Sequence, residues 1–106
     1  MDPELCLQPA TVIARLIRQR AVSAREVLAA HLSRIEAINP HVNAIVTLDV
    51  EGAQRRANAI DTALARGEDP GPLAGLPVAH KDLAETKGLR TTYGSPIFAD
   101  FVPDFD

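Results

Sequence analysis

Residues 75–83 read Gly-Leu-Pro-Val-Ala-His-Lys-Asp-Leu, and this apolar run ending in a lysine sets the expected architecture. Its nearly continuous apolarity is typical of a strand that is covered on both faces. Because side chains alternate along a strand, Ala79 and Lys81 would share one face, so the lysine has a small neighbour there rather than another charge. We therefore predict a strand over residues 77–81.

Apolar residues recur at helical spacing in three earlier segments, which we predict to be helices over residues 9–20, 23–39 and 50–66. The second begins with Ser-Ala-Arg-Glu at 23–26, a capping box in which the serine oxygen accepts a hydrogen bond from the N3 amide. We predict that it ends at Asn39, because a proline follows. Gly67 suits the left-handed position after the third helix.

A second strand is predicted over residues 44–48, where three consecutive β-branched residues, Ile45, Val46 and Thr47, favour extended backbone. Two strands and three helices together indicate an α/β fold, with helices packed on a mixed β-sheet. The sequence reads as one piece of a domain over residues 1–106. The last ten positions hold three of the four aromatic residues, and such an apolar tail needs a partner surface, so we expect the isolated chain to self-associate.

Composition argues against several classes of function. A formal charge of −3 opposes direct nucleic-acid binding, which needs a basic face. Cys6 is the only cysteine, so it cannot form an internal disulfide, which fits a reducing compartment. No apolar run reaches the roughly 20 residues that span a bilayer, and the N-terminus has no secretory h-region. We expect a cytoplasmic protein without membrane contact. The histidines lack metal-ligand spacing and no phosphate-binding glycine motif occurs, so no metal and no cofactor are expected.

Lys81 has two interpretations from the residues alone. A lysine at the end of a strand commonly lays its stem along the surface and keeps its ammonium in water. A lysine carried inward is a candidate for chemistry, because desolvation lowers its pKa towards the neutral form that accepts a proton. Asp82 either helps to position the lysine or caps the next segment, and a structural use is the simpler of the two.

Three pieces of the chain, in this order, resemble the amidase signature family. They are the Ser-Ala-Arg-Glu-Val helix that ends in Ile-Glu-Ala-Ile-Asn-Pro at 35–40, the Gly-Leu-Pro-Val-Ala-His-Lys-Asp block at 75–82, and Lys-Gly-Leu-Arg-Thr-Thr-Tyr-Gly-Ser at 87–95. The likeness extends from about residue 8 to Asp104. It implies the N-terminal portion of an α/β/α enzyme that hydrolyses carboxylic amides of small molecules through a Ser–cis-Ser–Lys triad.

By that resemblance Lys81 is the triad lysine and the one catalytic residue that this chain supplies. In the family both serines lie on a Gly/Ser-rich segment well downstream of the lysine, and this chain contains no such segment. Ser23 is a helix cap, Ser33 lies on a helix face and Ser95 belongs to a turn. The chain alone is therefore expected to be inert. Two alternatives stay open, a helical interaction module without chemistry and an A-type subunit of a glutamyl-tRNA amidotransferase.

Overall fold

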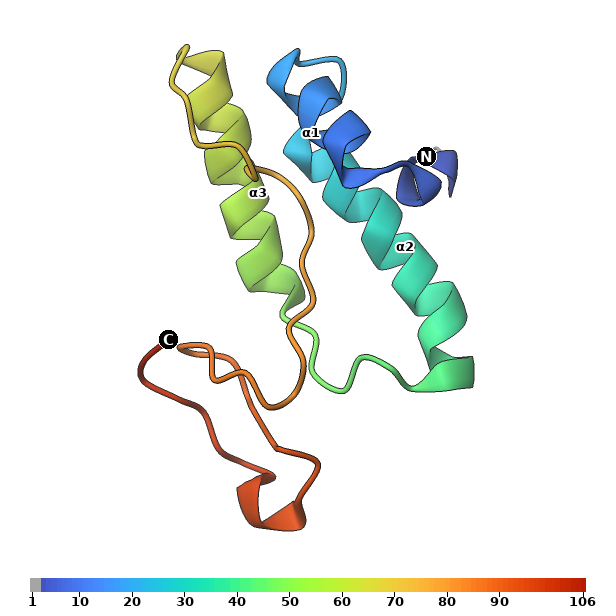
Figure 1. Ribbon diagram of the computed structural model, residues 1–106, viewed down its shortest axis with the longest axis vertical. Helices are drawn as coiled ribbons and strands as arrows, with labels where there is room; N and C mark the ends of the chain where they lie inside the picture. The colour runs from blue at the N-terminus through green and yellow to red at the C-terminus, as the bar shows by residue number, and fades with distance from the viewer. Residues whose placement is uncertain (1–2) are drawn as a thin grey trace. The chain divides into compact units, whose positions relative to one another are not determined.

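The computed structural model describes residues 3–106. The chain divides into two compact units. The first unit holds the chain up to Val42 together with Val50–Pro77, and the second holds Asn43–Asp49 with Val78–Asp106. Within residues 3–106 five helical elements follow one another, the 3-10 helices being marked η (Figure 1): η1 Pro3–Leu7, α1 Ala10–Arg18, α2 Ala24–Val42, α3 Val50–Ala65 and η2 Pro96–Phe98.

No strand or sheet forms among residues 3–106, so the predicted α/β fold with a mixed sheet is wrong. Residues 44–48 and 77–81 are both irregular. A strand is stable only when a neighbouring strand accepts and donates its ladder hydrogen bonds, and neither segment has such a neighbour. The β-branched residues of the first segment and the apolarity of the second are not sufficient by themselves.

Helix α1 ends in a Schellman motif with an arginine in the left-handed position. Arg20 has a φ of 60°. Its N–H donates to the carbonyl of Ile17 at 2.9 Å, and the N–H of Ala21 donates to the carbonyl of Leu16 at 2.9 Å. These two bonds satisfy carbonyls that the end of the helix would leave unpaired.

Helix α2 begins at the predicted cap and ends later than predicted. The N–H of Glu26 donates to Ser23 Oγ at 2.9 Å. The helix passes through Pro40 and stops only at Val42, so the prediction of an end at Asn39 was wrong. Pro40 lies in the last turn, where its missing N–H removes a single bond near the fraying end of the helix. Asn43, with a φ of 47°, then turns the chain out of the helix.

Helix α3 ends at the predicted glycine. Gly67 has a φ of 75°, and its N–H donates to the carbonyl of Leu64 at 3.0 Å. The N–H of Glu68 donates to the carbonyl of Ala63 at 3.0 Å, which completes a second Schellman motif. Glycine is suited to this position because it has no Cβ to clash in the left-handed region.

The core lies in the first unit, where α2 contacts both η1 and α3 (Figure 1). It is small and aliphatic, and each of the elements η1, α1 and α2 contributes to it: Leu5, Ile13, Ile17, Val27 and Ala30. Partly buried residues, among them Leu64 of α3 and Leu76 of the following loop, pack against this cluster. None of the helices formed by residues 3–106 combines the length and apolarity needed to cross a bilayer.

The second unit is built from turns and η2 rather than from regular elements. Two backbone bonds hold its returning chain together: the N–H of Gly88 donates to the carbonyl of Pro103 at 2.9 Å, and that of Thr91 to the carbonyl of Phe101 at 3.0 Å. The rings of Tyr93 and Phe98 lie 5.2 Å apart between centroids, and Phe98 and Phe101 lie 5.8 Å apart. Such aromatic pairs stabilise the unit in the absence of a sheet.

Candidate functional site

Lys81 lies in the second unit, on irregular backbone that leads into a turn. Its carbonyl accepts a hydrogen bond from the N–H of Ala84 at 2.9 Å, which closes the turn. The side chain of Lys81 is exposed. The strand that was expected to carry this lysine inward does not form, so its ammonium stays in solvent.

Asp82, the next residue, is tied to the segment ten residues further along. Its Oδ1 accepts from the backbone N–H of Thr92 at 2.7 Å, and its Oδ2 accepts from the Thr92 hydroxyl. The carbonyl of Asp82 also accepts from the N–H of Tyr93 at 2.9 Å. The hydroxyl and the backbone N–H of Thr92 lower the pKa of the Asp82 carboxyl below its ordinary value, and the nearby charge of Arg90 adds to this.

The partner segment is a tight turn over residues 92–95. The N–H of Ser95 donates to the carbonyl of Thr92 at 2.9 Å, and both central residues have positive φ, 54° at Tyr93 and 67° at Gly94. Positive φ at both central positions is the mark of a type I′ turn, in which asparagine and glycine are usual and tyrosine is not. Partial removal from water, and then the hydrogen bond to Glu85 and the charge of its carboxylate, raise the pKa of Tyr93 above its ordinary value.

The three serines have structural positions. Ser23 caps α2 through the N–H of Glu26. Ser95 Oγ accepts from the N–H of Ile97 at 3.3 Å and so caps η2. Ser33 is exposed on α2. Each serine therefore lies where the sequence indicated, and none of these contacts is a contact with a proton-accepting side chain.

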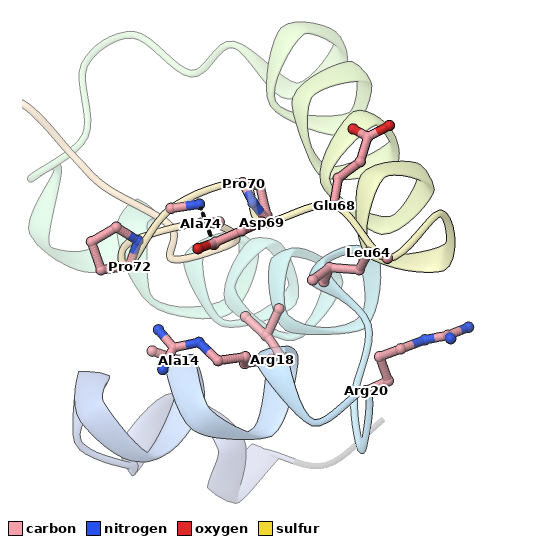
Figure 2. A pocket seen from close by; sticks show the side chains of 12 residues that line it. Ala14, Arg18, Arg20, Leu64, Glu68, Asp69, Pro70, Pro72 and Ala74 are labelled. Atoms are coloured by element: carbon pink, nitrogen blue, oxygen red, sulfur yellow. Dashed lines mark hydrogen bonds between the residues drawn. The ribbon is translucent and has the colours of Figure 1, made fainter.

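A groove with a volume of about 420 Å³ lies in the first unit, between the end of α1, the end of α3 and the loop that follows α3 (Figure 2). Ile17 and Leu64 supply apolar lining, and Figure 2 shows Arg20 and Glu68 extending away from the loop. Asp69 Oδ1 accepts from the N–H of Gly71 at 3.0 Å and shapes that loop. Its lining contains no lysine, serine, cysteine or histidine, so the groove offers neither a nucleophile nor a proton acceptor of those kinds.

The sequence predicted Lys81 as a site residue but did not predict the contacts around it. The Asp82–Thr92 contact joins two positions with no periodic relation, and only the mixture of threonine, glycine and serine in the 91–95 segment could have indicated a tight turn there. Among residues 3–106 no group of three or more histidine, cysteine or carboxylate side chains is arranged to hold a metal ion.

Residues 26–106 match a family model described as amidase. The A-type subunit of the glutamyl-tRNA(Gln) amidotransferase of Acidothermus cellulolyticus is 46% identical over 103 residues, which are 97% of this chain and 20% of that protein. The protein of the same name from Carboxydothermus hydrogenoformans is 45% identical over 103 residues, 97% of this chain and 21% of that protein.

A third relative of that name, from Bdellovibrio bacteriovorus, is 45% identical over 94 residues, 89% of this chain and 19% of that protein. The chain thus spans about a fifth of the length of these curated relatives and covers their N-terminal part. No solved structure matches it. Since the family model covers most of the chain, from α2 through the Lys81 segment to Asp106, this chain belongs to the amidase family.

Proposed function

We propose that this chain supplies Lys81 as the proton acceptor of an enzyme that hydrolyses carboxylic amides. The observation that carries the proposal is the match of residues 26–106 to the amidase family, a range that includes Lys81 and both segments around it. Identity of 46% over 97% of the chain to a relative named as part of an amidotransferase supports the same chemical class.

The chemistry requires Lys81 in its neutral form. In this proposal burial and nearby dipoles in the complete enzyme favour that form, because removing an amine from water disfavours its charge. The neutral amine then takes a proton from a serine on a cis peptide, which activates a second serine to attack the amide carbonyl. Backbone N–H groups stabilise the oxyanion that forms. The C–N bond then breaks as the amine leaves with the relayed proton, and water releases the acyl group from the serine. In this proposal both catalytic serines belong to polypeptide outside this chain, and the chain alone is inactive.

Because Lys81 is exposed in this chain, the rest of the enzyme has to cover it. Here the side chain is in solvent, and the chain spans only about a fifth of its relatives' length. We assign the covering of Lys81 to the remaining polypeptide. Proton transfer requires the serine that donates the proton to lie within hydrogen-bond reach of the lysine, about 2.6–3.2 Å. In this proposal that serine belongs to the remaining polypeptide.

A second candidate is an A-type subunit of a glutamyl-tRNA(Gln) amidotransferase, because the relatives described above carry that name. In this reading the amide nitrogen is passed to glutamyl-tRNA(Gln) instead of being released. Because this chain carries a formal net charge of −3, we assign contact with the tRNA to other parts of the assembly. Amide formation on glutamyl-tRNA(Gln) by the assembled parent would select this candidate, and hydrolysis of free amides alone would select the first.

Lys81→Ala in the full-length parent tests the proposal. Removing the proton acceptor should lower kcat for ammonia release by about 10²–10⁴-fold, the usual contribution of a general base. Ammonia release is measured on a panel of carboxylic amides, with far-UV circular dichroism to verify folding. Lys87→Ala is the matched control, because Lys87 is the only other lysine of the chain and is also exposed.

Wild-type turnover by a folded Lys81→Ala enzyme would contradict the proposal and would favour the reading of this chain as a helical interaction module that takes no part in the chemistry.

For the isolated 106-residue chain we propose two properties, absence of amide hydrolysis and self-association through its exposed apolar residues. Detectable hydrolysis by the purified chain would contradict the assignment of the serines to the remaining polypeptide.

A further inference from the structure

We infer that Asp82 is a positioning residue for Lys81, holding the backbone from which the lysine projects by binding Thr92 in the turn at residues 92–95. The inference rests on the proposed role of Lys81. In this inference Asp82 does not touch the substrate and acts only by positioning the neighbouring Lys81.

The geometry concentrates hydrogen bonds immediately after the lysine. Asp82 accepts three of them, two on its carboxylate from Thr92 and one on its carbonyl from the N–H of Tyr93. The carbonyl of Lys81 itself accepts from Ala84. The backbone of an otherwise irregular segment is thereby held at two consecutive residues.

The other end of the contact is the best-buried part of the second unit. Thr91 is 2% exposed and Thr92 is 8% exposed, and these two are the buried polar residues among those described. Thr91 donates its N–H to the carbonyl of Phe101 at 3.0 Å, and the N–H of Gly94 donates to Thr92 Oγ1 at 3.2 Å. Asp82 therefore links the backbone beside an exposed lysine to a buried point of the second unit.

A lysine needs such a link because its side chain is long and flexible. Its four-carbon stem is flexible and does not by itself fix the position of the amine, so that position depends on where the backbone is held. A misplacement of about 1 Å at a reacting group costs on the order of 10²-fold in rate. Since both carboxylate oxygens are bound by Thr92, the Asp82 anion is also directed at Thr92 and not at the amine, which has to be neutral to accept a proton.

Two pairs of variants in the full-length parent test the inference. Asp82→Ala removes both carboxylate hydrogen bonds, whereas Thr92→Val removes the one that the hydroxyl donates and leaves the backbone N–H of residue 92 able to bind Asp82 Oδ1. We expect Asp82→Ala to lower kcat for amide hydrolysis on the order of 10²-fold with little change in KM, and Thr92→Val to lower kcat by a smaller factor. Asp82→Asn and Thr92→Ser keep groups that can make these bonds, and we expect each to restore most of the lost kcat. Asp104→Ala, an exposed carboxylate of the same unit, is the matched control with unchanged kcat.

All rates are measured well below the thermal midpoint of each variant, with the folded fraction taken from circular dichroism. Wild-type kcat in folded Asp82→Ala or folded Thr92→Val would overturn the inference. So would an Asp82→Asn enzyme as slow as Asp82→Ala, because then the charge and not the position would matter. A different result tests the proposed function, because a fully active Lys81→Ala enzyme would contradict it. If Lys81→Ala is inactive and Asp82→Ala is fully active, only the positioning role of Asp82 is contradicted.

Discussion

Gly75 lies where the loop after α3 passes directly over the helices of the first unit. Its φ is +85°, and a Cβ at this position would lie 2.8 Å from Ile17 Cδ1 and 3.2 Å from the Cβ of Ala24. Ile17 is 1% exposed and Ala24 is fully buried, so an added methyl group would force these packed side chains to shift. Glycine is thus required here twice, for its left-handed backbone and for the close approach of the chain to the core.

Gly75→Ala should therefore destabilise the chain by about 2–5 kcal/mol. This sums roughly 1–2 kcal/mol for an L-residue in the left-handed region and about 1–3 kcal/mol for overpacking. Urea unfolding followed by circular dichroism measures the loss. Gly67→Ala is the matched control, because Gly67 has a φ of +75° with nothing within 4 Å of its Cβ position, so only the backbone part applies. Equal losses at the two sites would contradict the packing argument.

At the scale of the elements, α3 caps α2 through a side chain. Asp61 Oδ1 accepts from the N–H of Ala24 at 2.7 Å, and Asp61 Oδ2 accepts from the N–H of Arg25 at 3.2 Å. Together with Ser23 Oγ, which accepts from Glu26, three of the otherwise unpaired N–H groups at the start of α2 are satisfied. The carboxylate also lies at the positive end of the α2 dipole.

Asp61→Ala should cost about 1–2 kcal/mol of folding free energy, the range measured for losing a helix cap and its charge. Thermal unfolding by circular dichroism provides the measurement. The isosteric control is Asp61→Asn, which keeps one acceptor oxygen and removes the charge, so its loss should be smaller. If Asp61→Ala unfolds at the wild-type temperature, α3 does not cap α2 in solution.

At the scale of the whole molecule, the second unit leaves large apolar side chains in solvent. Val78 is 72% exposed, Leu83 54%, Ile97 87% and Phe105 53%. Exposed apolar groups of this size on a small chain are sites of association. The aromatic tail predicted this behaviour, and these exposed fractions support that prediction.

The isolated chain should consequently increase in mass with concentration in size-exclusion chromatography with light scattering. Ile97→Asp should shift it towards the monomer, since a charge on the most exposed apolar side chain of the second unit opposes burial. Leu73→Asp serves as the control, because Leu73 is 74% exposed but belongs to the first unit. A monomer at every concentration, or equal effects of the two variants, would contradict association through the second unit.

Local chemistry allowed the helices and their caps to be anticipated from the residues. The Ser23 cap of α2 and the Gly67 end of α3 involve partners within a few residues, so their patterns are visible along the chain. The same reasoning went wrong at Pro40, because a proline in the last turn removes only one bond. It went wrong more seriously for residues 44–48 and 77–81, whose extended character required partners that this chain does not provide.

The motif around Lys81 allowed the residue to be selected as a candidate, but the environment of its side chain could not be predicted from the sequence. What the residues decided alone were the short-range features, three helices and their terminal hydrogen bonds, because each such bond spans four residues or so. Three-dimensional packing decided the absence of a sheet. It also decided the capping of α2 by Asp61 and the hydrogen bonds between Asp82 and Thr92, which join positions 37 and 10 residues apart. Such contacts depend on where distant segments meet, and no periodicity in the chain encodes that meeting.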